Sequence, residues 1–259
     1  MLRNTFQHIR GMGSAEELTL WRHGVLRWEQ VERLRFNLFS AELMQRLRVG
    51  VKESVDALAR GDVAFFMESL SAGLLPRLVP EFGKRMCYVD IETTGLDLKT
   101  DSITTVTALY QGCVHTYVRG RDFALLPDAL PRGAVIVSFN GKSFDLPFLL
   151  KEFGRDIMRL HIDLVPVLKA WGFTGSLKAV ERSFGIMRTE PEGITGAHAV
   201  KLWDEYEAIG NASALAQLTA YSRRDTLSLA EIMTSLYGDT MRGFPERFCS
   251  LTTEKPNIL

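Results

Sequence analysis

Two acidic residues separated by one apolar residue stand at the end of an apolar segment, as Asp90-Ile91-Glu92. Residues 86–89 before them favour a β-strand, in which side chains two positions apart share a face. Both carboxylates would therefore project together while Ile91 points into the core. Carboxylates this close repel each other unless a cation compensates them, and hard divalent cations such as Mg²⁺ and Mn²⁺ prefer oxygen ligands. The pair alone is also compatible with a strand that simply ends in solvent.

A third carboxylate, Asp145, lies shortly after the apolar segment 135–139, beyond a turn that begins at Asn140. Pro147, two residues later, is typical of a first helical turn, so Asp145 is predicted at a helix start. An acidic residue there often only complements the helix dipole. In an open α/β sheet, however, ligands bind in the crevice at the strand ends. In that arrangement Asn140 would donate a hydrogen bond to a phosphate or a sugar.

A fourth carboxylate, Asp225, follows Tyr221 by four residues within a helical pattern that starts near Ala212. Positions four apart lie on one face of a helix, so the phenol and the carboxylate are predicted one turn apart. Such an acid would ligate a metal while the phenol orients a water molecule. Taken alone, the pair is more simply interpreted as a surface aspartate beside a half-buried tyrosine.

The elements that must position these groups are visible in the hydrophobic pattern. Apolar, β-favouring segments predict four strands, at residues 86–91, 103–110, 114–118 and 135–139. Gln111-Gly112 is typical of a hairpin turn between the second and the third. Helical patterns follow at residues 144–153, 164–170, 176–184, 197–209 and 212–237. Strands first and helices afterwards indicate an α/β domain with a mixed central sheet.

The chain ahead of the first strand has a different character. Residues 14–70 are predicted to be helical, because apolar residues recur at three- and four-residue spacing between Val31 and Leu58. Two prolines shortly before Gly83 then mark a boundary. These changes predict three parts: a helical N-terminal segment at 1–82, an α/β domain at 83–240 and a C-terminal tail at 241–259.

Composition excludes some classes of protein. The 259 residues include 31 basic and 31 acidic ones, so the formal net charge is zero. This balance argues against coating nucleic acid through bulk charge, though not against an enzyme that grips a few phosphates. The cysteines Cys87, Cys113 and Cys249 show no metal-binding spacing and are predicted to be reduced thiols of a cytoplasmic protein. The N-terminus lacks the pattern of a signal peptide, and no apolar run is long enough to predict a membrane span.

Taken together, the three acidic motifs resemble those of the DEDD exonuclease superfamily, which includes the proofreading domains of DNA polymerases. In chain order the motifs are Tyr88-Val89-Asp90-Ile91-Glu92-Thr93-Thr94-Gly95-Leu96, Phe139-Asn140-Gly141-Lys142-Ser143-Phe144-Asp145-Leu146-Pro147-Phe148-Leu149 and the pair Tyr221 and Asp225. Their joint occurrence is far more specific than any one of them. The histidine subclass would need a histidine where Ala220 stands, so the resemblance is to the tyrosine subclass. It implies an RNase H-like fold with helices flanking the mixed sheet.

The resemblance also implies a function, that of a metal-dependent 3′→5′ exonuclease with two divalent cations, Mg²⁺ or Mn²⁺. Four carboxylates would hold the cations, namely Asp90, Glu92, Asp145 and Asp225. Tyr221 would orient the attacking water, which makes it the fifth predicted catalytic residue. The predicted substrate contacts are Thr93, Gly95, Leu96 and Asn140. Of these, Leu96 would wedge against the terminal base.

Further segments are similar to the bacterial YprB-type group, mostly predicted RNase H-like exonucleases, over about residues 84–237. They are His161-Ile162-Asp163-Leu164, Ser176-Leu177-Lys178-Ala179-Val180-Glu181, Phe184-Gly185-Ile186-Met187-Arg188 and Gly193-Ile194-Thr195-Gly196. Residues 5–13 and 20–25 look like a fragment of a helix-hairpin-helix, whose Gly-x-Gly turn presents backbone amides to a phosphate. Arg10 stands where that motif usually has proline. DNA contact and a purely structural helix start are therefore both open for this segment.

Nucleic acid is the expected partner, with single-stranded DNA favoured over RNA. An RNA 3′-end trimming enzyme is the first alternative, because contacts to the 2′-hydroxyl depend on pocket shape. A catalytically silent nucleic-acid-binding module is the second, and the presence of all five motif residues argues against it. A third possibility makes residues 1–80 a helical module that docks a partner protein through an exposed apolar patch.

Overall fold

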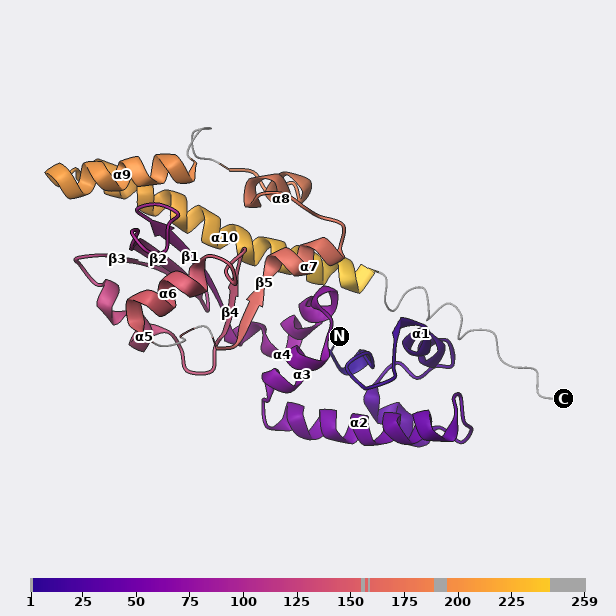
Figure 1. The fold of residues 1–259 in the computed structure, drawn as a ribbon. Helices are drawn as coiled ribbons and strands as arrows, with labels where there is room; N and C mark the ends of the chain where they lie inside the picture. The colour runs from indigo at the N-terminus through magenta and orange to yellow at the C-terminus, as the bar shows by residue number, and fades with distance from the viewer. Residues whose placement is uncertain (1, 155–156, 158, 189–194, 243–259) are drawn as a thin grey trace. The chain divides into compact units, whose positions relative to one another are not determined.

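The computed structural model describes residues 2–154, 157, 159–188 and 195–242 (Figure 1). The described residues form two compact units, one from residues 2–83 together with 234–242 and the other from within residues 84–233. The domain limits inferred from the sequence stay a prediction, and the tail from residue 243 lies outside the described residues. Within the described ranges, no helix combines the length and the hydrophobicity needed to cross a membrane.

The second unit is built on a five-stranded mixed sheet in the order β3-β2-β1-β4-β5. The strands are β1 Met86–Thr93, β2 Ile103–Tyr110, β3 Cys113–Val118, β4 Val135–Ser138 and β5 His161–Asp163. β2 pairs antiparallel with β1 and β3, whereas β4 runs parallel to β1 and β5. The predicted α/β fold with a mixed central sheet is confirmed, and so are the four predicted strands.

The turn between β2 and β3 confirms the predicted hairpin. Gln111 and Gly112 both have positive φ, at 48° and 81°, as a two-residue hairpin turn with the twist of its strands requires. The short strand β5 was not predicted. Cys87, buried on β1, and Cys113, exposed at the start of β3, form no disulfide, while Cys249 lies outside the described residues.

Six α-helices and two 3₁₀ helices accompany the sheet in the part of the chain described. Their bounds are η4 Gly83–Arg85, η5 Phe123–Leu125, α5 Leu126–Ala129, α6 Asp145–Phe153, α7 Leu164–Ala170, α8 Leu177–Ser183, α9 Gly196–Ile209 and α10 Ala212–Arg242. The five predicted helices are confirmed, with α10 longer than expected. The short α5 was not predicted, and of the YprB-like segments Gly193-Ile194 lies outside the described residues.

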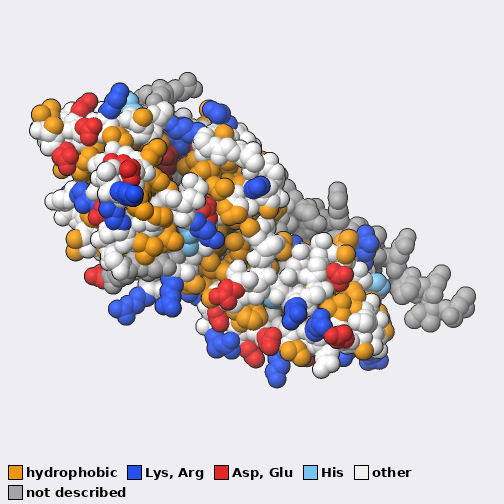
Figure 2. All heavy atoms as spheres, viewed as in Figure 1, with side chains coloured by type: hydrophobic (Ala, Val, Ile, Leu, Met, Phe, Trp, Pro, Cys, Tyr) orange, Lys and Arg blue, Asp and Glu red, His pale blue; other side chains and the backbone are white. Residues whose placement is uncertain are grey.

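Helices cover both faces of the sheet, and Figure 1 shows α6 and α10 on opposite sides of it. One core packs Val89 and Ile91 of β1 against Phe148 and Leu149 of α6. A second core joins α9 and α10. On the face viewed in Figure 2, acidic and basic side chains are interspersed, with no continuous field of one sign, as the neutral net charge leads one to expect.

The first unit is helical, but not as one continuous pattern. Its elements are η1 Leu2–Asn4, α1 Ser14–Arg22, η2 Trp28–Arg33, α2 Ala41–Ala59, α3 Val63–Ser69, η3 Ala72–Leu78 and α4 Val79–Phe82. The apolar residues Leu34 and Leu38 lie between helices, so the prediction that residues 14–70 are helical throughout was wrong there. Ser40 ends the interruption, because its side chain accepts the Leu43 amide and caps α2.

The turn that resembles a helix-hairpin-helix precedes α1. Gly11 takes a positive φ of 90°, which suits glycine. The Gly13 amide, which such a motif would present to a phosphate, donates to Oε2 of Glu16 at 2.9 Å. This amide is therefore already hydrogen-bonded to a carboxylate of the chain itself. Contact of the segment with DNA stays a prediction, as does docking of a partner protein by the first unit.

Candidate metal centre

Alternation along β1 separates the acidic side chains from the core. Cys87, Val89 and Ile91 belong to the buried cluster under α6. Asp90 and Glu92, one position out of phase, therefore face the opposite side of the sheet, as predicted. The pairing of β1 with β2 is irregular between Glu92 and the next residue, so the acidic pair lies where the regular ladder ends.

Helix α10 crosses that second face and brings the third motif to the strand. The Ser222 hydroxyl donates to Asp90 Oδ2 at 3.4 Å and pairs with the Thr107 hydroxyl of β2 at 2.8 Å. Ser222 is fully buried, so this hydroxyl chain fixes α10 against the sheet. The Tyr221 hydroxyl donates to Asp225, which lies one helical turn further along α10. The predicted neighbourhood of phenol and carboxylate is thus present.

Three carboxylates from two elements converge. Asp90, Glu92 and Asp225 each offer an oxygen within 4.8 Å of the others. Glu92 and Asp225 are buried, while Asp90 is partly exposed. Oxygen donors from three carboxylates are the ligand set that hard divalent cations take. The residues therefore fit a site for such a cation.

The electrostatics of the cluster point the same way. Burial, followed by the charges of its carboxylate neighbours, raises the pKa of Asp90 well above its ordinary range. Burial likewise raises the pKa of Glu92, with Asp225 and Asp145 as the next causes and Lys178 opposing them. Burial also raises the pKa of Asp225, although a neighbouring arginine works against it. An added divalent cation would relieve this repulsion.

Asp145 lies at the first position of α6 and is only 4% exposed. It is not part of the group of three oxygens within 4.8 Å, but its charge reaches Asp90 and Glu92 and raises the pKa of both. Burial raises its own pKa to about 7, against a hydrogen bond from its own backbone amide. The sequence predicted four acidic ligands, and the structure brings three of them together with the fourth beside them.

A residue without a predicted role shapes the loop before Asp145. Asp163, at the end of β5, accepts backbone amides from Asn140, Lys142 and Val165 at 2.9–3.1 Å. These bonds fix the turn, in which Asn140 has a positive φ of 61° and an exposed side chain. The signals in the sequence were the position of Asp163 as the cap before α7 and its place in a segment similar to the YprB-type group.

The predicted substrate contacts after β1 form an ordered loop. The Thr93 hydroxyl donates to the Gly95 carbonyl at 2.5 Å. Gly95 packs so closely against the Asp101 carboxylate that a side chain there would collide with it. Leu96 is 85% exposed, as a residue that meets a base would be. Their roles in binding stay predictions.

One basic side chain next to the carboxylate cluster had no role predicted from the sequence. Arg188, beyond the end of α8, donates to both Glu181 and Asp225. No local signal in the sequence links these groups, because Arg188 and Asp225 are 37 positions apart. Lys178 of α8 lies with its Nζ 5.2 Å from the centre of the Tyr221 ring. Helix α8 and the residues after it thus supply the positive charge beside the carboxylates.

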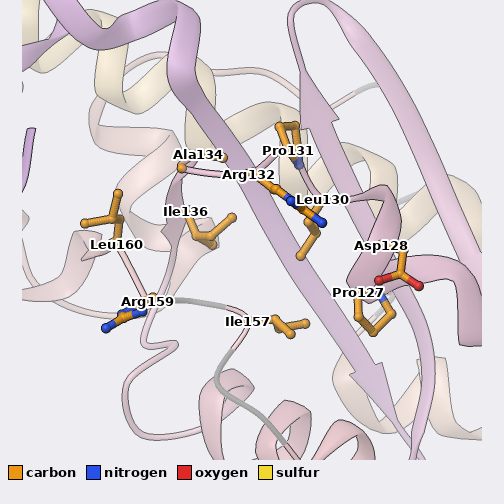
Figure 3. Close-up of a pocket in the computed structure, with 11 residues that line it drawn as sticks. Pro127, Asp128, Leu130, Pro131, Arg132, Ala134, Ile136, Ile157, Arg159 and Leu160 are labelled. Carbon is orange, nitrogen blue, oxygen red and sulfur yellow. The ribbon is translucent and has the colours of Figure 1, made fainter. Parts of the chain in front are cut away.

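A cavity of about 590 Å³ lies elsewhere in this unit. Figure 3 shows its lining, in which Ile136 of β4 and Leu160 before β5 stand with Leu130 and the exposed arginines Arg132 and Arg159. This places the cavity near the amino ends of the parallel strands. The predicted site residues follow the carboxyl ends, where open α/β sheets bind ligands, and none of them lines the cavity.

Comparison with known proteins agrees with the fold and with the cluster. A family model for the RNase H superfamily matches residues 87–237, more than half of the chain. The matched range begins in β1 and ends in α10, so it contains all four predicted ligands. A search of curated proteins gave no match. The chain belongs to the RNase H superfamily.

Proposed function

We propose that the protein is a 3′→5′ exonuclease of the DEDD tyrosine subclass, similar to the YprB-type group, that degrades single-stranded DNA in the cytoplasm. Members of the RNase H superfamily typically hydrolyse phosphodiester bonds with divalent cations. The observation that carries the proposal is the convergence of Asp90, Glu92 and Asp225, with Tyr221 hydrogen-bonded to the last of them.

The acidic residues would hold two cations, Mg²⁺ or Mn²⁺. Asp90, Glu92 and Asp225 would hold one of them, and Asp145 together with Asp90 would hold the other. Divalent cations bound there supply a nucleophilic water at neutral pH and stabilise charge on the phosphodiester. The hydroxyl of Ser222 holds Asp90 in place from behind, so this ligand is oriented before a cation arrives.

Tyr221 acts as a donor in this proposal, not as a base. Burial raises its pKa above the usual range, and the charges of Asp225, Glu92 and Asp90 raise it further. The phenol therefore stays protonated at neutral pH, where it orients the attacking water. Leu96 and Asn140, both exposed, receive the terminal nucleotide together with Thr93 and Gly95.

The test is cleavage of 5′-labelled single-stranded DNA and RNA with Mg²⁺ or Mn²⁺, comparing wild type with Asp225→Ala. Asp204→Ala, an exposed aspartate on α9, is the matched control. A ladder that shortens from the 3′ end, lost in Asp225→Ala and with chelator but kept in Asp204→Ala, is expected. Cleavage of RNA alone would make the protein an RNA-trimming enzyme. No cleavage by folded wild type would make it a silent binding module.

A further inference from the structure

The guanidinium of Arg188 sits between two buried carboxylates. Its Nε and Nη2 donate to the two oxygens of Glu181 at 2.7 and 2.8 Å, in a fork. Nη2 also donates to Oδ1 of Asp225. The Arg188 Cζ lies 5.8 Å from the centre of the Tyr221 ring. One cation of the protein thus touches both the predicted metal ligand and the predicted water-orienting residue.

The two carboxylates hold Arg188 in different ways. Glu181 is 1% exposed and gives both of its oxygens to Arg188, an arrangement in which two parallel bonds fix the plane of the guanidinium. Asp225 gives one oxygen and belongs to the three-carboxylate cluster. Glu181 is therefore an anchor, whereas the contact with Asp225 competes with any cation that the cluster binds.

We infer that Arg188 is a phosphate-binding residue of the site, anchored by Glu181 and held by Asp225 until divalent cations take that carboxylate. The inference rests on the proposed function for the identity of the ligand, which is a backbone phosphate of a nucleic acid. Release of Asp225 to a cation would free a donor of Arg188 Nη2 for the phosphate, while the bonds to Glu181 keep the guanidinium in place. A planar guanidinium matches phosphate oxygens, and its charge does not depend on pH.

A purely structural role for the ion pair makes different predictions. An arginine that only closes the turn after α8 would affect stability, and its loss would leave metal affinity unchanged or weaken it. An arginine that competes for Asp225 lowers the affinity of the cluster for cations, so its removal raises that affinity. The sign of the change in metal affinity therefore separates the two roles.

The first experiment is calorimetric titration of the full chain with Mn²⁺ in wild type, Arg188→Gln and Arg188→Lys. Arg182→Gln is the matched control, because Arg182 is an exposed arginine on α8, the helix that precedes Arg188. Loss of one positive charge next to the site is expected to tighten Mn²⁺ binding about ten-fold. Arg188→Lys, which keeps the charge and folds without an uncompensated Glu181, is expected to bind like wild type. Unchanged or weaker binding in Arg188→Gln would overturn the inference.

The second experiment tests the phosphate. Arg188→Gln is expected to raise KM for single-stranded DNA about ten-fold, and Arg182→Gln to leave it unchanged. A neutral methylphosphonate at the terminal linkages should remove the difference between wild type and Arg188→Gln. An unchanged KM in Arg188→Gln would contradict the phosphate contact. If wild type cleaves neither DNA nor RNA, the proposed function fails, and equilibrium binding of the same oligonucleotides to the Ca²⁺-loaded protein decides the contact by the same comparison.

Discussion

Two buried acidic sites in the two units show what distinguishes a structural carboxylate from a chemical one. In the first unit Glu17, 1% exposed, accepts hydrogen bonds from the Thr5 hydroxyl, the Phe6 amide and the Gln7 side chain. Arg77 completes the set with a contact at 2.9 Å. The protein itself thus compensates both the charge and the lone pairs of this carboxylate.

The cluster of the second unit has the opposite balance. Asp90 and Glu92 form no ion pair among the described residues. The charges of neighbouring carboxylates raise the pKa of both. Of the three carboxylates in the cluster, only Asp225 forms an ion pair with Arg188. Burial is common to both sites, so burial does not mark function. Buried carboxylates that face one another with too little positive charge from the protein to compensate them mark a place where an external cation belongs.

The largest expected effect comes from neutralising the cluster. Asp90→Asn removes a predicted ligand, and losing several kcal/mol of charge stabilisation lowers kcat on the order of a thousand-fold. The same change removes like-charge repulsion, so the thermal midpoint of the metal-free protein should rise. Rate assays and thermal melting in chelator check both signs. Asp204→Asn should change neither, and a fall in the midpoint for Asp90→Asn would contradict the account of the cluster.

Neutralising the buried carboxylate of the first unit should lower stability and leave metal binding unchanged. Glu17→Gln leaves Arg77 buried without its partner, which costs about 3–5 kcal/mol of unfolding free energy, while Mn²⁺ affinity of the folded protein is unchanged. Urea unfolding and metal titration measure the two quantities. Glu53→Gln, an exposed glutamate on α2, serves as control. Equal stability of Glu17→Gln and wild type would show that the bonds of Glu17 do not stabilise the fold, which would contradict the distinction between the two sites.

The contrast also explains how far the sequence could predict the site. Alternation along β1 and the four-residue spacing of Tyr221 and Asp225 are local rules, so they placed those side chains on the correct faces. Asp163 binds Asn140 and Arg188 binds Asp225 over more than twenty positions of the chain, and only tertiary packing brings these pairs together. β5 has three residues, too few for a periodic pattern. The apolar spacing across Leu34 and Leu38 wrongly predicted a helix there, because hydrophobic periodicity carries no information about a capping residue such as Ser40.

A third prediction concerns pH. Asp145 has an ordinary pKa of 3.8 that burial raises to about 7 in the folded protein. The folded state therefore binds its proton more tightly than the unfolded state, and this residue removes stability as pH rises from about 4 to 7. The loss is up to about 4 kcal/mol. Unfolding free energies in chelator should fall over this range, and less so in Asp145→Asn. Parallel pH profiles for the two proteins would exclude this assignment.

The smallest expected effect tests whether the cluster is held from behind. Ser222→Ala removes the hydroxyl that links Asp90 to Thr107, so the Asp90 carboxylate gains rotational freedom. Loss of such an orienting bond should weaken Mn²⁺ binding about ten-fold and cost about 1 kcal/mol of stability. Ser228→Ala is the matched control, because Ser228 is equally buried on α10 but bonds only the Arg224 carbonyl of its own helix. It should cost similar stability and leave Mn²⁺ affinity unchanged. Equal metal affinity in both variants would show that Asp90 is oriented by the strand alone.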